Sequence, residues 1–240
     1  MHQSAKRHGS REAPIDISNP EENGAPGLAG RVLFIDGEAL VMDKPAGLPV
    51  DRPKAGGDCI AGRLDELRFG FQRPPAPVHR LDRDTSGCLL LARNPKAQAR
   101  FAAAFEAGKV EKVYLAVVEG ELEGGGAIDL PLAKISSLEQ GWRMVVDAKG
   151  KAARTAWRAL GSKDGRTLVE FRPQTGRTHQ IRAHARYGLN SAVVGDPAYG
   201  RADGPMLLHA LRIVVPRENK PAIDVTAPLP DRFGDWRDVA

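Results

Sequence analysis

Residues 77–94 read PVHRLDRDTSGCLLLARN, a charged loop that leads directly into an apolar run. The run at 87–93, GCLLLAR, does not alternate between polar and apolar residues, which is typical of a strand buried on both faces. Asn94-Pro95 then favours a helix start, because an asparagine side chain can cap a helix whose first turn contains proline. The segment therefore predicts a loop, a buried strand and a helix in immediate succession.

Further strands are predicted on both sides of this segment. Val32–Ile35 and Ala39–Asp43 flank Asp36-Gly37, a dipeptide that suits a tight hairpin turn. Lys112–Gly120 is rich in β-branched residues, and a second hairpin is predicted around residues 163–165. Many strands, few helices and no regular alternation of the two predict an α+β fold: a mixed, mostly antiparallel sheet flanked by helices and loops.

A second helix is predicted within TGRTHQIRAHARYG, residues 175–188. Thr178 is a candidate cap, and Gly188 is a candidate left-handed stop after Tyr187. Arg177 would then lie where a strand ends and a helix begins.

The bulk composition narrows the class of protein. Lys and Arg exceed Asp and Glu by 35 to 30 in 240 residues, a modest excess that favours a polyanionic partner. Cys59 and Cys88 lack ligand spacing, which argues against a disulfide framework or a zinc site. No apolar stretch approaches the roughly 18 residues of a membrane span, and the amino terminus lacks a secretory signal, so we expect a cytoplasmic protein without membrane contact.

The chain is expected to contain one folded domain. Residues 1–27 contain no aromatic residue and much Gly, Pro, Ser and charge, so a disordered polar tail is predicted there. Residues 28–240 are predicted to form the domain.

Asp82 is the first candidate for chemistry in the charged loop. A carboxylate can act as a nucleophile, a general base or a metal ligand, and it can equally form a structural salt bridge with Arg80. If 79–84 is extended, Asp82 and Asp84 lie on the same side as Arg80, and Arg83 points away. His79 is a candidate general base, although a lone histidine at a strand edge is more often structural.

These residues carry a resemblance. HRLDRDTSG at 79–87 resembles the HRLDxxTSG signature of the RluA family of RNA pseudouridine synthases. Blocks that resemble the family's other motifs follow in the family's order, at 38–50, 111–120, 173–200 and 206–213. A single HRLD match would be weak, whereas this ordered set covers roughly 31–230 and is highly specific.

The resemblance implies an enzyme that isomerises a uridine within an RNA chain to pseudouridine and needs no cofactor or metal. The family's catalytic aspartate falls on Asp82, its active-site tyrosine on Tyr114 and its basic partner on Arg177. Arg177 would orient the carboxylate, and Tyr114 would stack on the uracil and transfer a proton near C5. Leu208 is a candidate apolar wall of the pocket. Cys88 replaces a more usual aliphatic residue, a small swap that should leave the chemistry unchanged.

The charged loop also suits RNA capture. A base within folded RNA is reached only by extruding it, at a cost of roughly a few kcal/mol. Candidate phosphate contacts, one of which can also fill the vacated stack, are Arg80, Arg83, Lys112 and Arg182. A short chain that lacks the family's amino-terminal S4-type domain is expected to act, as a monomer, on stem-loops of ribosomal RNA, transfer RNA or both. The competing hypotheses are an inactive RNA-binding domain on the same fold and a metal-assisted hydrolase that uses Asp82 and Asp84.

Overall fold

The apolar run of the opening segment forms an inner strand of a long sheet in the computed structural model, which describes residues 27–137 and 141–239. All seven residues of this strand, β4 (Ser86–Ala92), are buried, as its lack of alternation predicts. The tail predicted at 1–27 lies, apart from its last residue, outside the described residues.

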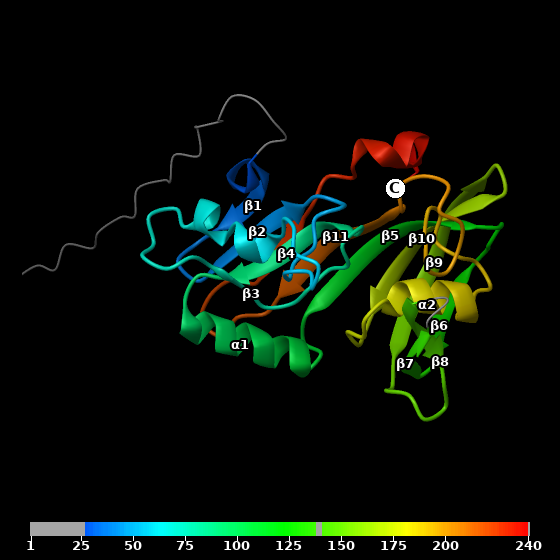
Figure 1. The fold of residues 1–240 in the computed structure, drawn as a ribbon, viewed down its shortest axis with the longest axis horizontal. Helices are drawn as coiled ribbons and strands as arrows, with labels where there is room; N and C mark the ends of the chain where they lie inside the picture. The colour runs from blue at the N-terminus through cyan, green and yellow to red at the C-terminus, as the bar shows by residue number, and fades with distance from the viewer. Residues whose placement is uncertain (1–26, 138–140, 240) are drawn as a thin grey trace, which may run out of the picture.

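The main sheet has ten strands, and the described pairs are antiparallel except for one (Figure 1). The exception is the parallel pair of β4 and β11. This arrangement confirms the predicted α+β fold with a mixed, mostly antiparallel sheet. Along the sheet the order is β1 (Val32–Ile35), β2 (Ala39–Lys44), β4, β11 (Leu208–Val215), β5 (Glu111–Glu119), β10 (Arg166–Pro173), β9 (Arg154–Lys163) and β6 (Gly125–Asp129), while β3 (Ala76–Pro77) pairs with β4 and β12 (Ile223–Thr226) with β11.

Two α-helices flank the sheet at opposite ends (Figure 1). The first, α1 (Pro95–Glu106), begins as predicted: the Asn94 side chain accepts a hydrogen bond of 2.8 Å from the Ala97 amide, and proline stands in the first turn. The second, α2 (Gln180–Gly188), follows β10. Short 3₁₀ helices complete the described elements: η1 (Leu28–Arg31), η2 (Ile60–Gly62), η3 (Leu64–Leu67) and η4 (Asp231–Asp238).

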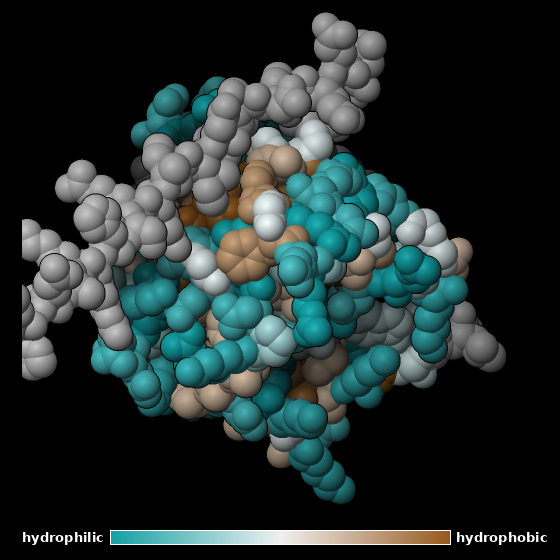
Figure 2. Space-filling view, turned by 90° about the vertical axis from the view of Figure 1, so that its left-hand side faces the viewer, coloured by the Kyte–Doolittle hydropathy of each residue, from teal (hydrophilic) through white to brown (hydrophobic). Residues whose placement is uncertain are grey.

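The β1–β4 end of the sheet is covered on both faces. Val41 and Leu90 pack toward α1 on one face, and Leu40 and Leu89 pack toward the 3₁₀ helices on the other. Figure 2 shows this end of the molecule, where hydrophilic side chains cover most of the described surface and apolar ones form small patches. In the described part of the chain, no helix has the length and apolar character that a membrane crossing requires.

The ends of α2 differ from the sequence-based prediction. The helix begins at Gln180 and is preceded by His179 at the cap position, not by Thr178, because His179 takes a left-handed conformation with φ 51° and Gln180 Oε1 accepts a hydrogen bond from the Arg177 amide. Gly188 belongs to the helix, and the left-handed residue after it is Asn190, with φ 53°. Gly188 is small for a packing reason, since a Cβ there would lie 2.6 Å from Ile128 Cγ2.

A separate hairpin of β7 (Leu132–Ser137) and β8 (Gly141–Val146) was not predicted from the sequence. It packs against α2 and the following loop through Met144, Ala183 and Tyr199. The Tyr199 hydroxyl accepts a hydrogen bond of 2.9 Å from the Met144 amide, which fixes the hairpin beside the start of α2.

Candidate active site

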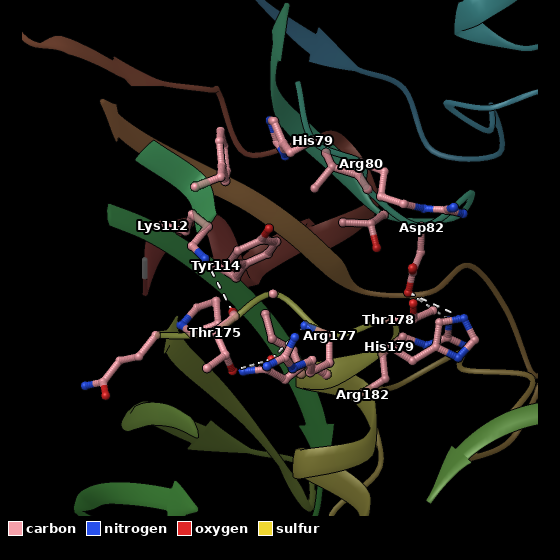
Figure 3. A pocket seen from close by; sticks show the side chains of 18 of the residues that line it. His79, Arg80, Asp82, Lys112, Tyr114, Thr175, Arg177, Thr178, His179 and Arg182 are labelled. Carbon is pink, nitrogen blue, oxygen red and sulfur yellow. Dashed lines mark hydrogen bonds and ion pairs between the residues drawn. The ribbon is translucent and has the colours of Figure 1, made fainter. Parts of the chain in front are cut away.

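Three segments that are distant in the sequence meet around one cavity of about 460 Å³. They are the charged loop before β4, strand β5 and the loop that connects β10 to α2 (Figure 3). The volume lies within the range of small-molecule pockets, roughly 300–1,000 Å³. The cavity is lined by Asp82, Tyr114, Arg177 and Leu208, so the four residues that the resemblance selected lie around the same space.

The loop that carries Asp82 turns sharply and is fixed by hydrogen bonds to its backbone. The Thr85 amide donates to the Asp82 carbonyl at 3.2 Å, so the segment is not extended through Asp84 as the spacing argument assumed. The fully buried Lys44 donates from Nζ to the Arg83 carbonyl at 2.9 Å, and also to the carbonyls of Pro45 and Leu48. Lys44 therefore ties the end of β2 to the residue that follows Asp82.

Burial lowers the pKa of Lys44 to about 7, and the negative charges of Asp84 and Asp82 oppose that shift. Three carbonyl acceptors match the three N–H donors of an ammonium group, so the contacts of Lys44 favour its charged form.

The Asp82 carboxylate is held by an arginine, but not by the one expected. Arg182 Nη1 donates to Asp82 Oδ2 at 3.0 Å, and in the described chain no ion pair joins Asp82 to Arg177. Arg177 is exposed, and its Nε donates to the Ala152 carbonyl at 2.9 Å. The physical reason is the late start of α2: with His179 left-handed, the first helical turn directs Arg182 at Asp82, while Arg177 remains on the preceding loop.

Arg182 is fixed on its far side by Asp196. The Nε and Nη2 atoms of Arg182 each donate to one oxygen of the fully buried Asp196, both at 2.7 Å. Burial alone would lower the pKa of Arg182, but the hydrogen bonds and charges of Asp196 and Asp82 outweigh it and raise the pKa. Only 6% of the Arg182 surface is exposed and its guanidinium faces two carboxylates, and the phosphate contact expected of it stays a prediction.

His179 stands beside the same carboxylate. Its Nε2 lies 3.8 Å from Asp82 Oδ2, and its Nδ1 is 3.1 Å from the Tyr199 hydroxyl. Burial lowers the pKa of His179, with Asp82 opposing, so the ring is neutral near pH 7. Its other neighbour is Trp142 of β8, whose ring stacks on the imidazole with a centroid distance of 4.6 Å.

Tyr114 and Leu208 form part of the opposite wall, on neighbouring strands β5 and β11. Burial raises the pKa of Tyr114, and the Asp82 charge raises it further, so the hydroxyl keeps its proton near neutral pH. Lys112 precedes Tyr114 by two residues on β5, so both side chains lie on the same face of the strand. Lys112 also lines the cavity, and its Nζ donates to the Thr175 carbonyl at 3.4 Å. Figure 3 shows Lys112 and Tyr114 facing the cavity from the same strand.

The remaining charged-loop residues divide into surface and interior. Arg80 and Arg83 are exposed and pair with Asp51 at 2.9 Å and Asp84 at 3.0 Å. His79 instead accepts a hydrogen bond of 2.9 Å from the Leu90 amide, stacks on Phe105, and has its pKa lowered to about 3 by burial. These contacts are those of a structural histidine, which was the alternative to a general base in the interpretation of the sequence.

Several residues of the site escaped the sequence analysis. Asp196 and Tyr199 lie within the block at 173–200 that resembles a family motif, but only the fold reveals that they hold Arg182 and His179. Trp142 belongs to the hairpin that was not predicted. In the described ranges, no group of three or more His, Cys, Asp and Glu side chains has a metal-binding arrangement.

Comparison with known proteins places this geometry in a family. A model of RNA pseudouridylate synthases matches residues 38–187. An uncharacterized RNA pseudouridine synthase of Zymomonas mobilis is 54% identical over 215 residues, which cover 88% of this chain and 98% of that protein. Ribosomal large subunit pseudouridine synthase D of the same organism is 36% identical over 78% of this chain, although the match spans only 61% of that longer protein.

A solved structure supports the assignment at the level of the fold. Human RNA pseudouridylate synthase domain containing 4 superposes with a TM-score of 0.72 and 26% identity, and the match covers 86% of this chain and 91% of the human one. The chain therefore belongs to the RNA pseudouridylate synthase family, a group of isomerases.

Proposed function

We propose that this protein converts specific uridines in structured ribosomal RNA, transfer RNA or both to pseudouridine, with Asp82 as the catalytic carboxylate. The observation that carries the proposal is the position of Asp82: its carboxylate lines a cavity of about 460 Å³, paired with Arg182 and across from Tyr114. The Asp82 side chain is 20% exposed, so a bound uridine would contact the carboxylate with little water between them.

The reaction is an isomerisation in which one bond is exchanged for another. The C1'–N1 bond breaks, a C1'–C5 bond forms, the C5 proton is lost and N1 gains a proton. An ionised carboxylate can assist in two ways, by attacking C1' or by removing a proton from the sugar, and both leave the same carboxylate in contact with the reacting nucleotide. Arg182 would fix the orientation of Asp82 in either route.

Tyr114 and Leu208 are proposed to hold the uracil. The tyrosine ring offers a stacking surface, and its hydroxyl, kept protonated by burial and by Asp82, can exchange a proton near C5. Leu208 is 3% exposed and would form an apolar contact with the base. Arg177 lines the same cavity and is exposed, so we assign it to substrate contact rather than to the orientation of Asp82.

The RNA is proposed to lie across the basic rim of the site. Arg80, Arg83 and Lys112 are the candidate phosphate contacts, and the target uridine would leave its stack to reach Asp82. The relative named as a ribosomal large subunit enzyme supports ribosomal RNA as a substrate class. Because the match covers only 61% of that longer protein, the substrate of the relative does not exclude transfer RNA for this chain. Such substrates imply a cytoplasmic protein.

The proposal is tested with RNA whose uridines carry tritium at C5. Isomerisation releases that label to water, and we expect release by the wild-type chain without added metal or cofactor. Asp82→Asn should retain RNA affinity and lose release by at least ~1,000-fold, since it removes the essential carboxylate. The matched change Asp224→Asn, at an exposed ion pair on β12 outside the cavity, should leave release unchanged.

Release by Asp82→Asn at the wild-type rate would refute the assignment of the carboxylate. Binding without release by the wild-type chain would favour the inactive RNA-binding domain. The modified positions follow from carbodiimide mapping and primer extension of cellular RNA with and without the gene.

A further inference from the structure

A second cavity of about 410 Å³ lies on the other side of the catalytic carboxylate. Asp82, His179 and Arg182 line both cavities, so they form a shared wall between them. The first cavity extends from this wall toward Tyr114, and the second extends toward Trp142. The second cavity is not needed to hold the target uracil.

We propose that the second cavity is a subsite for the nucleotide next to the target uridine, whose base stacks on Trp142. This inference rests on the proposed function, because it requires an RNA chain with one ribose at Asp82. A polynucleotide that places one nucleotide against the shared wall must continue to a neighbouring space in at least one direction, and the second cavity adjoins that wall.

Trp142 has the properties of an unoccupied stacking platform. It is 45% exposed, the most exposed of the large hydrophobic side chains in the described part of the chain. Its ring is nonetheless fixed by a stack on His179, with an interplanar angle of 27°. An exposed aromatic ring held in one orientation beside a reactive site suits a flat, apolar partner, and every nucleobase has such a face.

The charges around the second cavity suit the phosphates of the same nucleotide. Arg80 and Arg83 line it together with their carboxylate partners, the exposed Asp51 and the half-buried Asp84. Exposed ion pairs contribute little to stability, so a phosphate can replace Asp51 at Arg80 without a large penalty. Lys134 Nζ lies 4.9 Å from the Trp142 ring centroid, a contact weaker than a base–aromatic stack, and its release would provide another cation for the backbone.

The test uses a stem-loop RNA with an all-uridine loop and measures binding by tryptophan fluorescence. Of the three tryptophans, Trp236 is only 7% exposed, and neither it nor the half-buried Trp157 lines a cavity, so quenching on binding should arise mainly from Trp142. Trp142→Ala should weaken binding by about 10-fold, the size expected when one base–aromatic stack is lost. Trp142→Phe should retain most of the affinity and lose the quenching.

A matched control is Ile135→Ala on β7, a hairpin residue that is 41% exposed and does not line the cavity. Binding by this variant should match that of the wild-type chain, which separates loss of stacking from disturbance of the hairpin. Probes with one abasic nucleotide beside the target position complete the test. Removal of the stacked base should weaken binding to the wild-type chain by about 10-fold and should cost Trp142→Ala nothing further.

Three outcomes would each overturn the proposal. They are unchanged affinity in Trp142→Ala, additive losses of affinity from Trp142→Ala and from removal of the base, and absence of quenching when RNA binds. These outcomes concern binding alone. Failure of the proposed function would show itself differently, as bound RNA from which the wild-type chain releases no C5 label.

Discussion

Asp196 is the residue on which the orientation of the Asp82–Arg182 pair depends. It is fully buried, binds Arg182 through both oxygens, and is itself fixed by the Ala198 amide at 2.8 Å. Asp196→Asn keeps the shape of the side chain but replaces one acceptor oxygen by a donor NH₂ group. It also removes one of the negative charges that compensate the buried Arg182 guanidinium. We expect label release per bound RNA to fall on the order of 100-fold, because misplacement of a reacting group by about 1 Å has that effect.

RNA affinity should remain within ~2-fold in the same variant, because Asp196 lines neither cavity and Arg182 faces carboxylates rather than solvent. Arg182→Lys, which loses the two-pronged contact to Asp196, should lose release in the same way. A defect of Asp196→Asn confined to RNA affinity would contradict a positioning role. Urea denaturation of both variants separates unfolding from misorientation.

At this scale the sequence predicted that Asp82 and Tyr114 share one site, which agrees with the cavity they both line, but it did not predict that Arg182 pairs with Asp82. The HRLD segment sufficed for Asp82, and the KVYLAVVEG strand sufficed to bring Tyr114 to the same cavity. Arg182 reaches Asp82 from a helix whose start is set by the left-handed φ of 51° at His179, and Asp196 fixes its guanidinium from the far side. A non-glycine residue seldom takes that conformation, so no local pattern predicts it.

At the scale of elements, α2 is held to β6 by the close approach of Gly188 to Ile128. Alanine favours a helix over glycine by about 1 kcal/mol, so an unconstrained site would gain stability from Gly188→Ala. Here the new Cβ would lie 2.6 Å from Ile128 Cγ2, and the branched side chain is buried and cannot rotate away. Overpacking of this kind costs about 1–3 kcal/mol, so we expect net destabilisation, measured by urea denaturation.

The same substitution should change sign in an Ile128→Ala background. With the obstructing methyl groups gone, Gly188→Ala should stabilise the protein relative to Ile128→Ala alone. Equal effects in both backgrounds would show that the contact does not determine the residue. The same contact explains why the predicted helix end was wrong. A glycine after a helical pattern predicts a left-handed cap, yet Gly188 is required by its contact with Ile128 of β6, a strand far away in the sequence.

At the scale of the whole molecule, strands with strong local patterns were predicted and their order was not. Local hairpins such as β1–β2 and β9–β10 followed from turn residues. The parallel pairing of β4 with β11 joins segments more than a hundred residues apart, and it depends on Gly87, where a Cβ would lie 2.2 Å from the Ala210 carbonyl oxygen. The β7–β8 hairpin lacks clean alternation, since its residues contact α2 on one side and the site on the other.

The assembled fold buries histidines in their neutral form, which makes its stability depend on pH. Burial lowers the pKa of His209 from 6.5 to about 4 and that of His79 to about 3, and it also lowers the pKa values of His179 and His184. A histidine with a lower pKa in the folded chain takes up its proton first in the unfolded chain. Stability is therefore greatest above pH 6.5 and falls as the pH drops below it.

His209 and His79, whose pKa values lie far below that of the unfolded chain, each contribute a slope of about 1.4 kcal/mol per pH unit once the unfolded form is protonated. For the fully buried His209, the loss between pH 7 and pH 5 amounts to about 2 kcal/mol. Urea denaturation at intervals across this range should show the decline. His209→Gln retains a polar group beside Ser86, which lies 2.7 Å from His209 Nδ1, but cannot titrate, so its stability should fall less steeply. A slope equal to that of the wild-type chain would mean that His209 is not the group that resists protonation.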